Sequence, residues 1–177
     1  EDPYYTVKIH QGENSYLTKA FNDGDIDLLF TTNAKLGLKG AYKEKKLGVK
    51  KFSLVCNNKL AAKIGPVKGV EAVNEQRFIN YTPDSDIHFK IQKLFNSKNI
   101  HPIRSAEIDD LNLTLQTVLS MNCFAILPDN LVNEKIKNNE LTKIRCSLTT
   151  LDTPITAFYK PRLNEQRFEN HLKCKLT

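Results

Sequence analysis

The stretch GENSYLTKAFNDGDIDLLFTT, residues 12–32, decides the fold class of this chain. Apolar residues recur at intervals of three and four from Asn14 onward, which predicts a short amphipathic helix. Asn14 or Ser15 would be its N-cap, and Gly24 would end it in the left-handed conformation. The following residues 26–32 contain the apolar run of residues 28–30 after Ile26, which predicts a parallel strand that is buried on both faces.

A strand is also predicted before this helix, because residues 5–10 alternate between apolar and polar side chains. Strand, helix and strand together would form a βαβ unit with a parallel sheet. Periodicity and capping residues predict further elements along the chain. These are strands at 52–56, 77–81, 103–106, 124–127 and 155–160, and helices that begin at Ser85, at Asp109–Asp110 and at Pro128, with a last helix that contains Phe168 and Leu172. The sequence therefore predicts an α/β fold.

The composition is that of an ordinary globular protein, with 177 residues, 40% hydrophobic and 26% charged, and a formal net charge of +6. No uncharged stretch is apolar enough for a membrane span, and no signal peptide is expected after Glu1. The positive charge is concentrated in residues 34–51, which hold seven lysines and one glutamate. This cluster is either a nucleic-acid surface or a solvated loop with glycines; the scarcity of stacking aromatic residues favours the loop.

Nothing in the sequence predicts catalysis or a bound cofactor. The four cysteines form no CxxC pair of the kind that binds zinc. Cys56 and Cys123 lie in apolar runs, so we expect buried, reduced thiols and a cytoplasmic protein. No nucleophile elbow, Walker loop or HExxH motif is present, and the chain is therefore not expected to be an enzyme.

The motif Gly-x-Asn-Ser-x-Leu-x-x-x-Phe-x-x-Gly-x-Ile-Asp-Leu at residues 12–28 resembles the regulatory domain of LysR-type transcriptional regulators. The resemblance continues through the strand and Lys-Leu-Ala turn at 52–61, the helix at Ser85 and the Leu-Pro pair at 127–128. It covers residues 7 to about 143. The order and spacing of these motifs are more specific than any one of them. The segment Glu-Ile-Asp-Asp at 107–110 further resembles the branch that regulates sodium/proton antiporters.

This resemblance implies a two-lobed domain of the periplasmic-binding-protein type with two hinge strands. By analogy, lobe I would comprise residues 1–55 and 127–177, and lobe II residues 56–126. The family's first strand and helix would precede Glu1, and its DNA-binding winged helix-turn-helix is missing from this chain. The implied partners are a small-molecule effector, or a cation, held between the lobes, and DNA bound through the missing domain. The family also implies a homodimer or homotetramer, with no membrane partner.

The candidate effector-binding residues lie at helix starts and strand ends, where N–H groups and a partial positive charge favour an anion. They are Asn14, Ser15, Thr31, Thr32, Asp84, Ser85, Asp86 and Asp109. Capping alone is the simpler interpretation of the Asn and Ser residues. A second alternative is a cation site made by Asp84, Asp86, His88, Glu107, Asp109 and Asp110. The default expectation for His88 is an exposed histidine.

Two other functions stay open at this point. A transport system's solute-binding protein would have the same two-lobed fold, and an export signal in the full gene would favour it. An enzyme on the same scaffold is the third hypothesis, which turnover in a substrate screen would reveal.

Overall fold

A computed structural model describes residues 7–32, 36–66, 68–83 and 85–161 of the chain. The chain divides into two compact units: unit 1 comprises residues 1–49 and 154–177, and unit 2 comprises residues 50–153. These boundaries differ from the lobe boundaries expected near residues 55 and 127. The reason is that the strand after residue 50 pairs with the strands on both sides of residue 130, so all three stay in one sheet.

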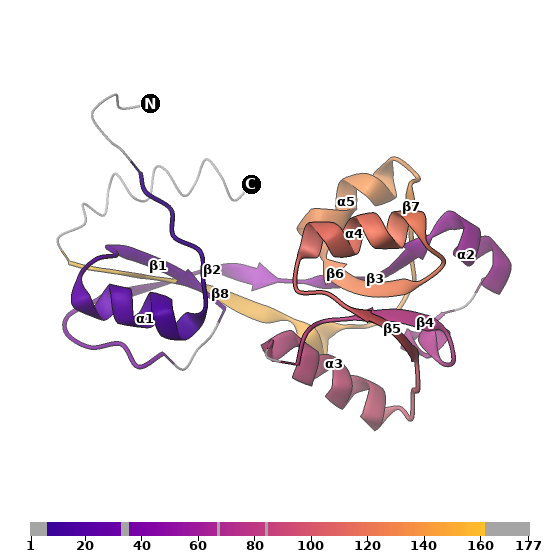
Figure 1. Ribbon diagram of the computed structural model, residues 1–177, viewed down its shortest axis with the longest axis horizontal. Coiled ribbons are helices and arrows are strands. Elements are labelled where there is room, and N and C mark those ends of the chain that lie inside the picture. Colours follow the sequence, from indigo (N-terminus) through magenta and orange to yellow (C-terminus); the bar gives the residue numbers. More distant parts are fainter. Residues whose placement is uncertain (1–6, 33–35, 67, 84, 162–177) are drawn as a thin grey trace. The chain divides into compact units, whose positions relative to one another are not determined.

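The described residues of unit 1 form a three-stranded sheet, with strand order β1-β8-β2, and the helix α1 (Figure 1). Its elements are α1 (Asn14–Asp23), β1 (Leu28–Thr31), β2 (Lys43–Lys50) and β8 (Thr153–Tyr159), of which β2 and β8 continue to the boundary with unit 2. Its main apolar cluster joins Phe21 of α1 to Leu29 and Phe158 of the sheet. The helix ends at Gly24, whose φ of 89° confirms the predicted left-handed position.

The predicted parallel βαβ arrangement is wrong in unit 1. Strand β1 pairs antiparallel with β8, and residues 7–10 form no strand, whereas residues 5 and 6 lie outside the described part. Burial alternates along β1, with Leu29 buried and Phe30 48% exposed. A strand that packs against the core on one face produces this alternation, even though its sequence is almost all apolar.

The second half of the lysine-rich segment forms strand β2 and not the expected loop. Leu47 points inward and packs against Ala157 and Tyr159 of β8, while most of the lysines stay at the surface. A single inward apolar residue in a charged edge strand is too weak a signal for a strand to be predicted from the sequence.

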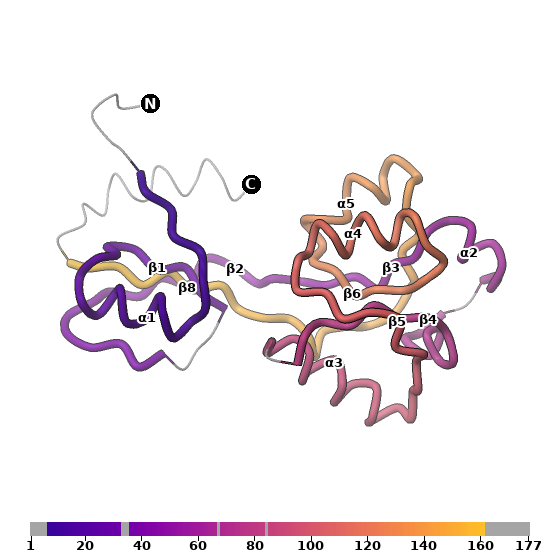
Figure 2. The backbone as a smooth tube through the Cα atoms, in the orientation of Figure 1, coloured from indigo at the N-terminus to yellow at the C-terminus, as the bar shows by residue number. Residues whose placement is uncertain are grey.

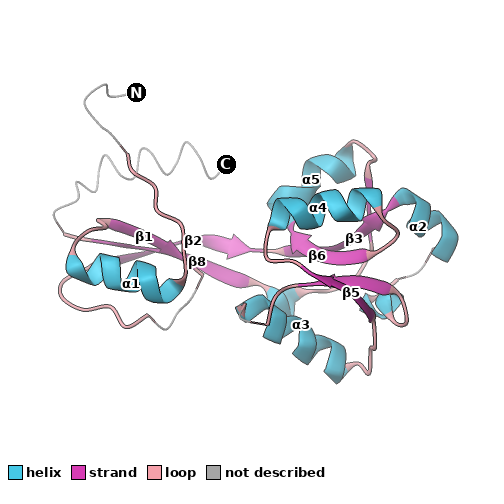
Figure 3. Cartoon of the chain, in the orientation of Figure 1, coloured by secondary structure: helices cyan, strands magenta, loops and turns pink. Residues whose placement is uncertain are grey.

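Unit 2 is a five-stranded mixed sheet with strand order β5-β4-β6-β3-β7 (Figures 1 and 3). β4 pairs in parallel with β5 and β6, and β3 pairs antiparallel with β6 and β7. The strands are β3 (Phe52–Asn57), β4 (Arg77–Asn80), β5 (Ile103–Glu107), β6 (Phe124–Pro128) and β7 (Leu141–Lys143). The helices are α2 (Asn58–Ile64), α3 (Asp86–Ser97), α4 (Leu111–Ser120) and α5 (Asp129–Lys137), with 3-10 turns at Val70–Val73 and Thr149–Leu151.

The helices of unit 2 cover both faces of the sheet. Ile91 and Phe95 of α3 belong to the same apolar cluster as Phe78, and Val118 of α4 belongs to the cluster of Ile79, the next residue of β4. The chain therefore leaves β4 through α3 on one face and leaves β5 through α4 on the other, a path that Figure 2 follows. The carboxyl ends of β4 and β5 thus form a topological switch point, the position where open α/β sheets bind ligands.

The remaining predicted strands of unit 2 are confirmed to within two residues, and Pro128 immediately precedes α5. The helix expected around Phe168 and Leu172 lies outside the described residues. Among the residues that are described, no helix is long and apolar enough to cross a bilayer.

Candidate functional site

The N-terminus of α3 lies just beyond the carboxyl end of β4. The Oγ of Ser85 accepts a hydrogen bond from the backbone N–H of His88 at 3.3 Å and donates one to the carbonyl oxygen of Thr82 at 3.0 Å. Ser85 is therefore the N-cap of α3, as predicted from the sequence. The cap fixes the first turn of α3 against the loop that leaves β4.

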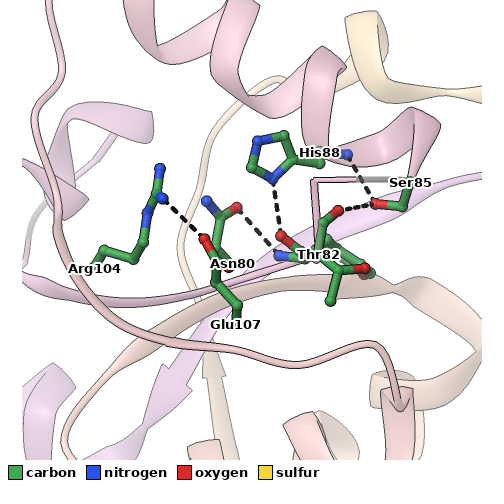
Figure 4. Close-up of polar contacts among 7 residues, drawn as sticks. Asn80, Thr82, Ser85, His88, Arg104 and Glu107 are labelled. Carbon is green, nitrogen blue, oxygen red and sulfur yellow. Dashed lines mark hydrogen bonds and ion pairs between the residues drawn. The ribbon is translucent and has the colours of Figure 1, made fainter.

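Two polar side chains at this strand end, Asn80 and His88, were not among the predicted effector-binding residues, and both bind the backbone of Tyr81 (Figure 4). The Oδ1 of Asn80 accepts from the Tyr81 N–H at 3.2 Å, and Nδ1 of His88 lies 2.8 Å from the Tyr81 carbonyl oxygen. Since a carbonyl oxygen can only accept, Nδ1 of His88 carries the proton. His88 is buried, so the expectation of an exposed histidine is wrong; its ring binds the Tyr81 carbonyl oxygen just after the end of β4.

Tyr81 itself is held firmly in the core. Its hydroxyl donates to the carbonyl oxygen of Ile126 at 2.9 Å, and burial raises the pKa of this phenol well above its usual value. The residue that Asn80 and His88 bind is therefore anchored to the neighbouring strand β6.

The end of β5 contributes a neutralised pair of charges. Arg104 and Glu107 are joined by an ion pair of 2.8 Å, and Glu107 lies opposite Asn80 in the strand register. Figure 4 shows this pair beside Asn80. Asp109, a predicted site residue, is exposed after β5, whereas its neighbour Asp110 caps α4 by accepting from the Leu113 N–H at 2.6 Å.

The remaining acidic candidates do not form a recognisable ion site. Asp86 is exposed in the first turn of α3, and Asp84 lies outside the described residues. Within the described ranges, no group of three or more His, Cys, Asp or Glu side chains is placed to hold a metal ion.

In unit 1 the structure brings together two of the four predicted site residues. The Oγ1 of the buried Thr31 donates to Oδ1 of Asn14 at 3.2 Å, whereas Ser15 and Thr32 are exposed. The N-cap position is taken by Glu13, whose side chain makes no capping hydrogen bond. The prediction that Asn14 or Ser15 is the N-cap is therefore wrong, since Asn14 already lies within the helix and its side chain turns to the end of β1.

The thiols of Cys56, Cys123 and Cys146 are not activated as nucleophiles. Burial, with a smaller effect from Cys123, raises the pKa of Cys56 to about 11, and burial also raises the pKa values of Cys123 and Cys146. A thiol that keeps its proton is a poor nucleophile, so these three cysteines are structural.

Several solved structures share this fold. The apo-form regulatory domain of HypT from Salmonella typhimurium is 15% identical, with a TM-score of 0.74 over 99% of this chain and 85% of that one. The regulatory domain of CcmR from Synechocystis PCC6803, in complex with 2-PG, is 13% identical, with a TM-score of 0.68 over 91% of this chain and 78% of that one. DarR from Vibrio fischeri, in complex with DNA, is 16% identical, with a TM-score of 0.75 over 100% of this chain and 60% of that one.

At these identities the structural matches establish the fold, a periplasmic-binding-protein-like α/β domain with two sheets. No curated protein is a significant match for the chain. The comparisons give no support to the antiporter-regulator branch.

The family is established by sequence. The family model described as the LysR substrate binding domain matches residues 1–171. Domains of this family bind small-molecule effectors and are not enzymes, and the LysR family binds DNA through a separate domain. The chain belongs to the LysR substrate-binding domain family, the effector-binding regulatory domains of LysR-type transcriptional regulators.

Proposed function

We propose that this chain senses a small-molecule effector through the polar groups at the start of α3 and couples effector binding to a separate helix-turn-helix domain. The observation that carries the proposal is the placement of Ser85, His88 and Asn80 at the carboxyl end of β4, beside the switch point between β4 and β5. Ligands of open α/β sheets bind at this position, where a helix N-terminus offers N–H groups.

The proposal includes a contribution from unit 1. The Asn14–Thr31 pair is a second set of polar groups at a strand end, and the family resemblance implies that it also contacts the effector. Effector binding then regulates the protein if the effector binds one conformational state more tightly than the other, because only a difference in affinity shifts the equilibrium.

We extend the proposal to the assembly and its compartment. The family resemblance supports a homodimer or homotetramer. The free thiols of Cys56, Cys123 and Cys146 support a reducing cytoplasm, since two of them are wholly buried and all three lack a disulfide partner in the described part of the chain.

A thermal-shift screen tests the proposal. The compounds are small carboxylates, amides and polyols, together with Na⁺, Mg²⁺ and Ca²⁺, because any ligand that prefers the native state raises the melting temperature. For a compound that binds, we expect Ser85→Ala and Asn14→Ala to weaken affinity about tenfold through lost hydrogen bonds. Both variants should keep melting temperatures within about 5 °C of wild type, since a lost cap or surface hydrogen bond costs about 1 kcal/mol.

The matched control lies at the other end of the same helix. The Oγ of Ser97 donates to the carbonyl oxygen of Leu94 and is remote in sequence from the N-terminus of α3. Ser97→Ala should leave effector affinity unchanged. Equal affinities for wild type and Ser85→Ala would remove the start of α3 from the site.

A further inference from the structure

Asn80 and His88 each have one polar atom that the protein does not use. Asn80 is 3% exposed and His88 is 8% exposed. Oδ1 of Asn80 and Nδ1 of His88 bind Tyr81, whereas Nδ2 of Asn80 and Nε2 of His88 have no hydrogen-bond partner among the described residues. Each of the two atoms is therefore left to bond with water or with a ligand.

These two atoms reach solvent although their residues are almost wholly buried. In the described part of the chain, every side-chain nitrogen or oxygen that is fully shielded from solvent has a hydrogen-bond partner. Nδ2 of Asn80 and Nε2 of His88 are therefore not fully shielded from solvent. A ligand atom that reached them would replace water and complete both side chains' hydrogen bonds.

The two side chains lie next to each other, because they bind the N–H and the carbonyl oxygen of one residue, Tyr81. Figure 4 shows the Asn80 amide and the His88 ring on the same side of the strand end. Their chemistry is complementary. Nδ2 of Asn80 donates, and in the tautomer of His88 whose single proton is on Nδ1, Nε2 accepts.

The charges around this position do not favour a carboxylate. The guanidinium of Arg104 is already paired with Glu107, and the first turn of α3 carries the exposed carboxylate of Asp86. The Asp86 charge offsets the attraction of the helix N-terminus for an anion.

We infer that Asn80 and His88 form a subsite for an uncharged polar group of the effector, a carboxamide or a hydroxyl. The group accepts a hydrogen bond from Nδ2 of Asn80 and donates one to Nε2 of His88. The inference rests on the proposed function, in which the effector binds at the end of β4, and it assigns the chemical class of the part that reaches these residues.

Three probes of nearly the same shape test this subsite: acetamide, acetate and acetamidinium. Acetamide both donates and accepts, acetate only accepts, and acetamidinium only donates. Each is titrated into the ¹⁵N-labelled chain, and binding is measured from the NMR signals of the Asn80 side-chain amide and the His88 ring nitrogens. We expect acetamide to bind about fivefold more tightly than either ion, which corresponds to one additional satisfied hydrogen bond.

The substitution Asn80→Asp keeps the acceptor for the Tyr81 N–H but replaces the two donors with a second acceptor. We expect it to reverse the preference, so that acetamidinium binds more tightly than acetamide. The matched control is Asn96→Asp, which makes the same change at an exposed position of α3 and should leave the wild-type preference intact.

Acetate binding as tightly as acetamide, or acetamide that moves neither set of signals, would overturn the inference. The outcome of this test can be distinguished from the outcome of the effector screen. A regulator that responds to an effector through Ser85 but shows no preference for acetamide keeps its proposed function and loses this subsite. Without any effector response, the proposed function itself fails.

Discussion

The thiol of Cys56 makes the stability of the protein depend on pH in the alkaline range. Its pKa is about 11 in the folded chain, against an ordinary value of 9.0. Above about pH 9 the unfolded thiol loses its proton while the folded thiol keeps it, so the free energy of unfolding falls as the pH rises towards 11. The full shift corresponds to roughly 2–3 kcal/mol.

The measurement is urea unfolding at several pH values for wild type and Cys56→Val, a variant that suits the interior of strand β3 and has no titrating group. We expect the stability of wild type to fall more steeply than that of the variant above about pH 9. Parallel curves would show that Cys56 does not titrate in this range.

The hydroxyl of Tyr81 is a second residue with a measurable contribution. Tyr81→Phe removes its hydrogen bond to Ile126 and should lower the free energy of unfolding by about 1 kcal/mol, as measured by urea denaturation. Tyr42→Phe is the control, since this tyrosine is 41% exposed and contacts Phe158 through its ring. A loss as large in the control as in Tyr81→Phe would contradict the assignment.

At the scale of elements, the end of α1 depends on one glycine. Gly24 has a φ of 89°, where a side chain is strained even though a Cβ there would meet no neighbour. Gly24→Ala should therefore destabilise the chain by about 1 kcal/mol. Gly48→Ala in β2, where φ is not positive and space is also open, should cost less than half as much. Thermal unfolding monitored by circular dichroism compares the two, and equal losses would argue against strain at Gly24.

The same scale explains which parts of the fold could be predicted from the sequence. Gly24, Ser85 and Pro128 each fix the backbone of adjacent residues, so the helix ends at these positions could be predicted from the local sequence. The pairing of β1 with β8 joins segments far apart in the chain and leaves no local pattern. β2 was not predicted, because charged side chains occupy most of its positions and leave too few apolar residues for an alternating pattern.

The residues of the candidate site also differ in whether a local sequence signal marks them. Ser85 was predicted because an N-cap is a local signal. Asn80 and His88 were not predicted as effector-binding residues, because their roles depend on how the end of β4 meets the first turn of α3, where both bind Tyr81. A polar residue after the apolar pair Phe78–Ile79 was the one available hint.

At the scale of the whole molecule, unit 2 is continuous in the chain and has its own apolar clusters on both faces of its sheet. A fragment of residues 50–153 should therefore fold alone, with dispersed amide NMR signals and a cooperative thermal transition. A fragment that binds hydrophobic dyes and unfolds without a cooperative transition would show that unit 2 needs unit 1. The reverse experiment is less favourable, because the two pieces of unit 1 are joined through unit 2.

The two junctions of unit 2 fall on strands that are neighbours in one sheet, with β2 entering unit 2 and β8 leaving it. An inserted segment whose ends emerge side by side can be exchanged between homologous hosts without cutting the host's core. Chimeras in which residues 50–153 replace the corresponding segment of another LysR regulator would change the ligand to which that regulator responds while leaving its promoter unchanged.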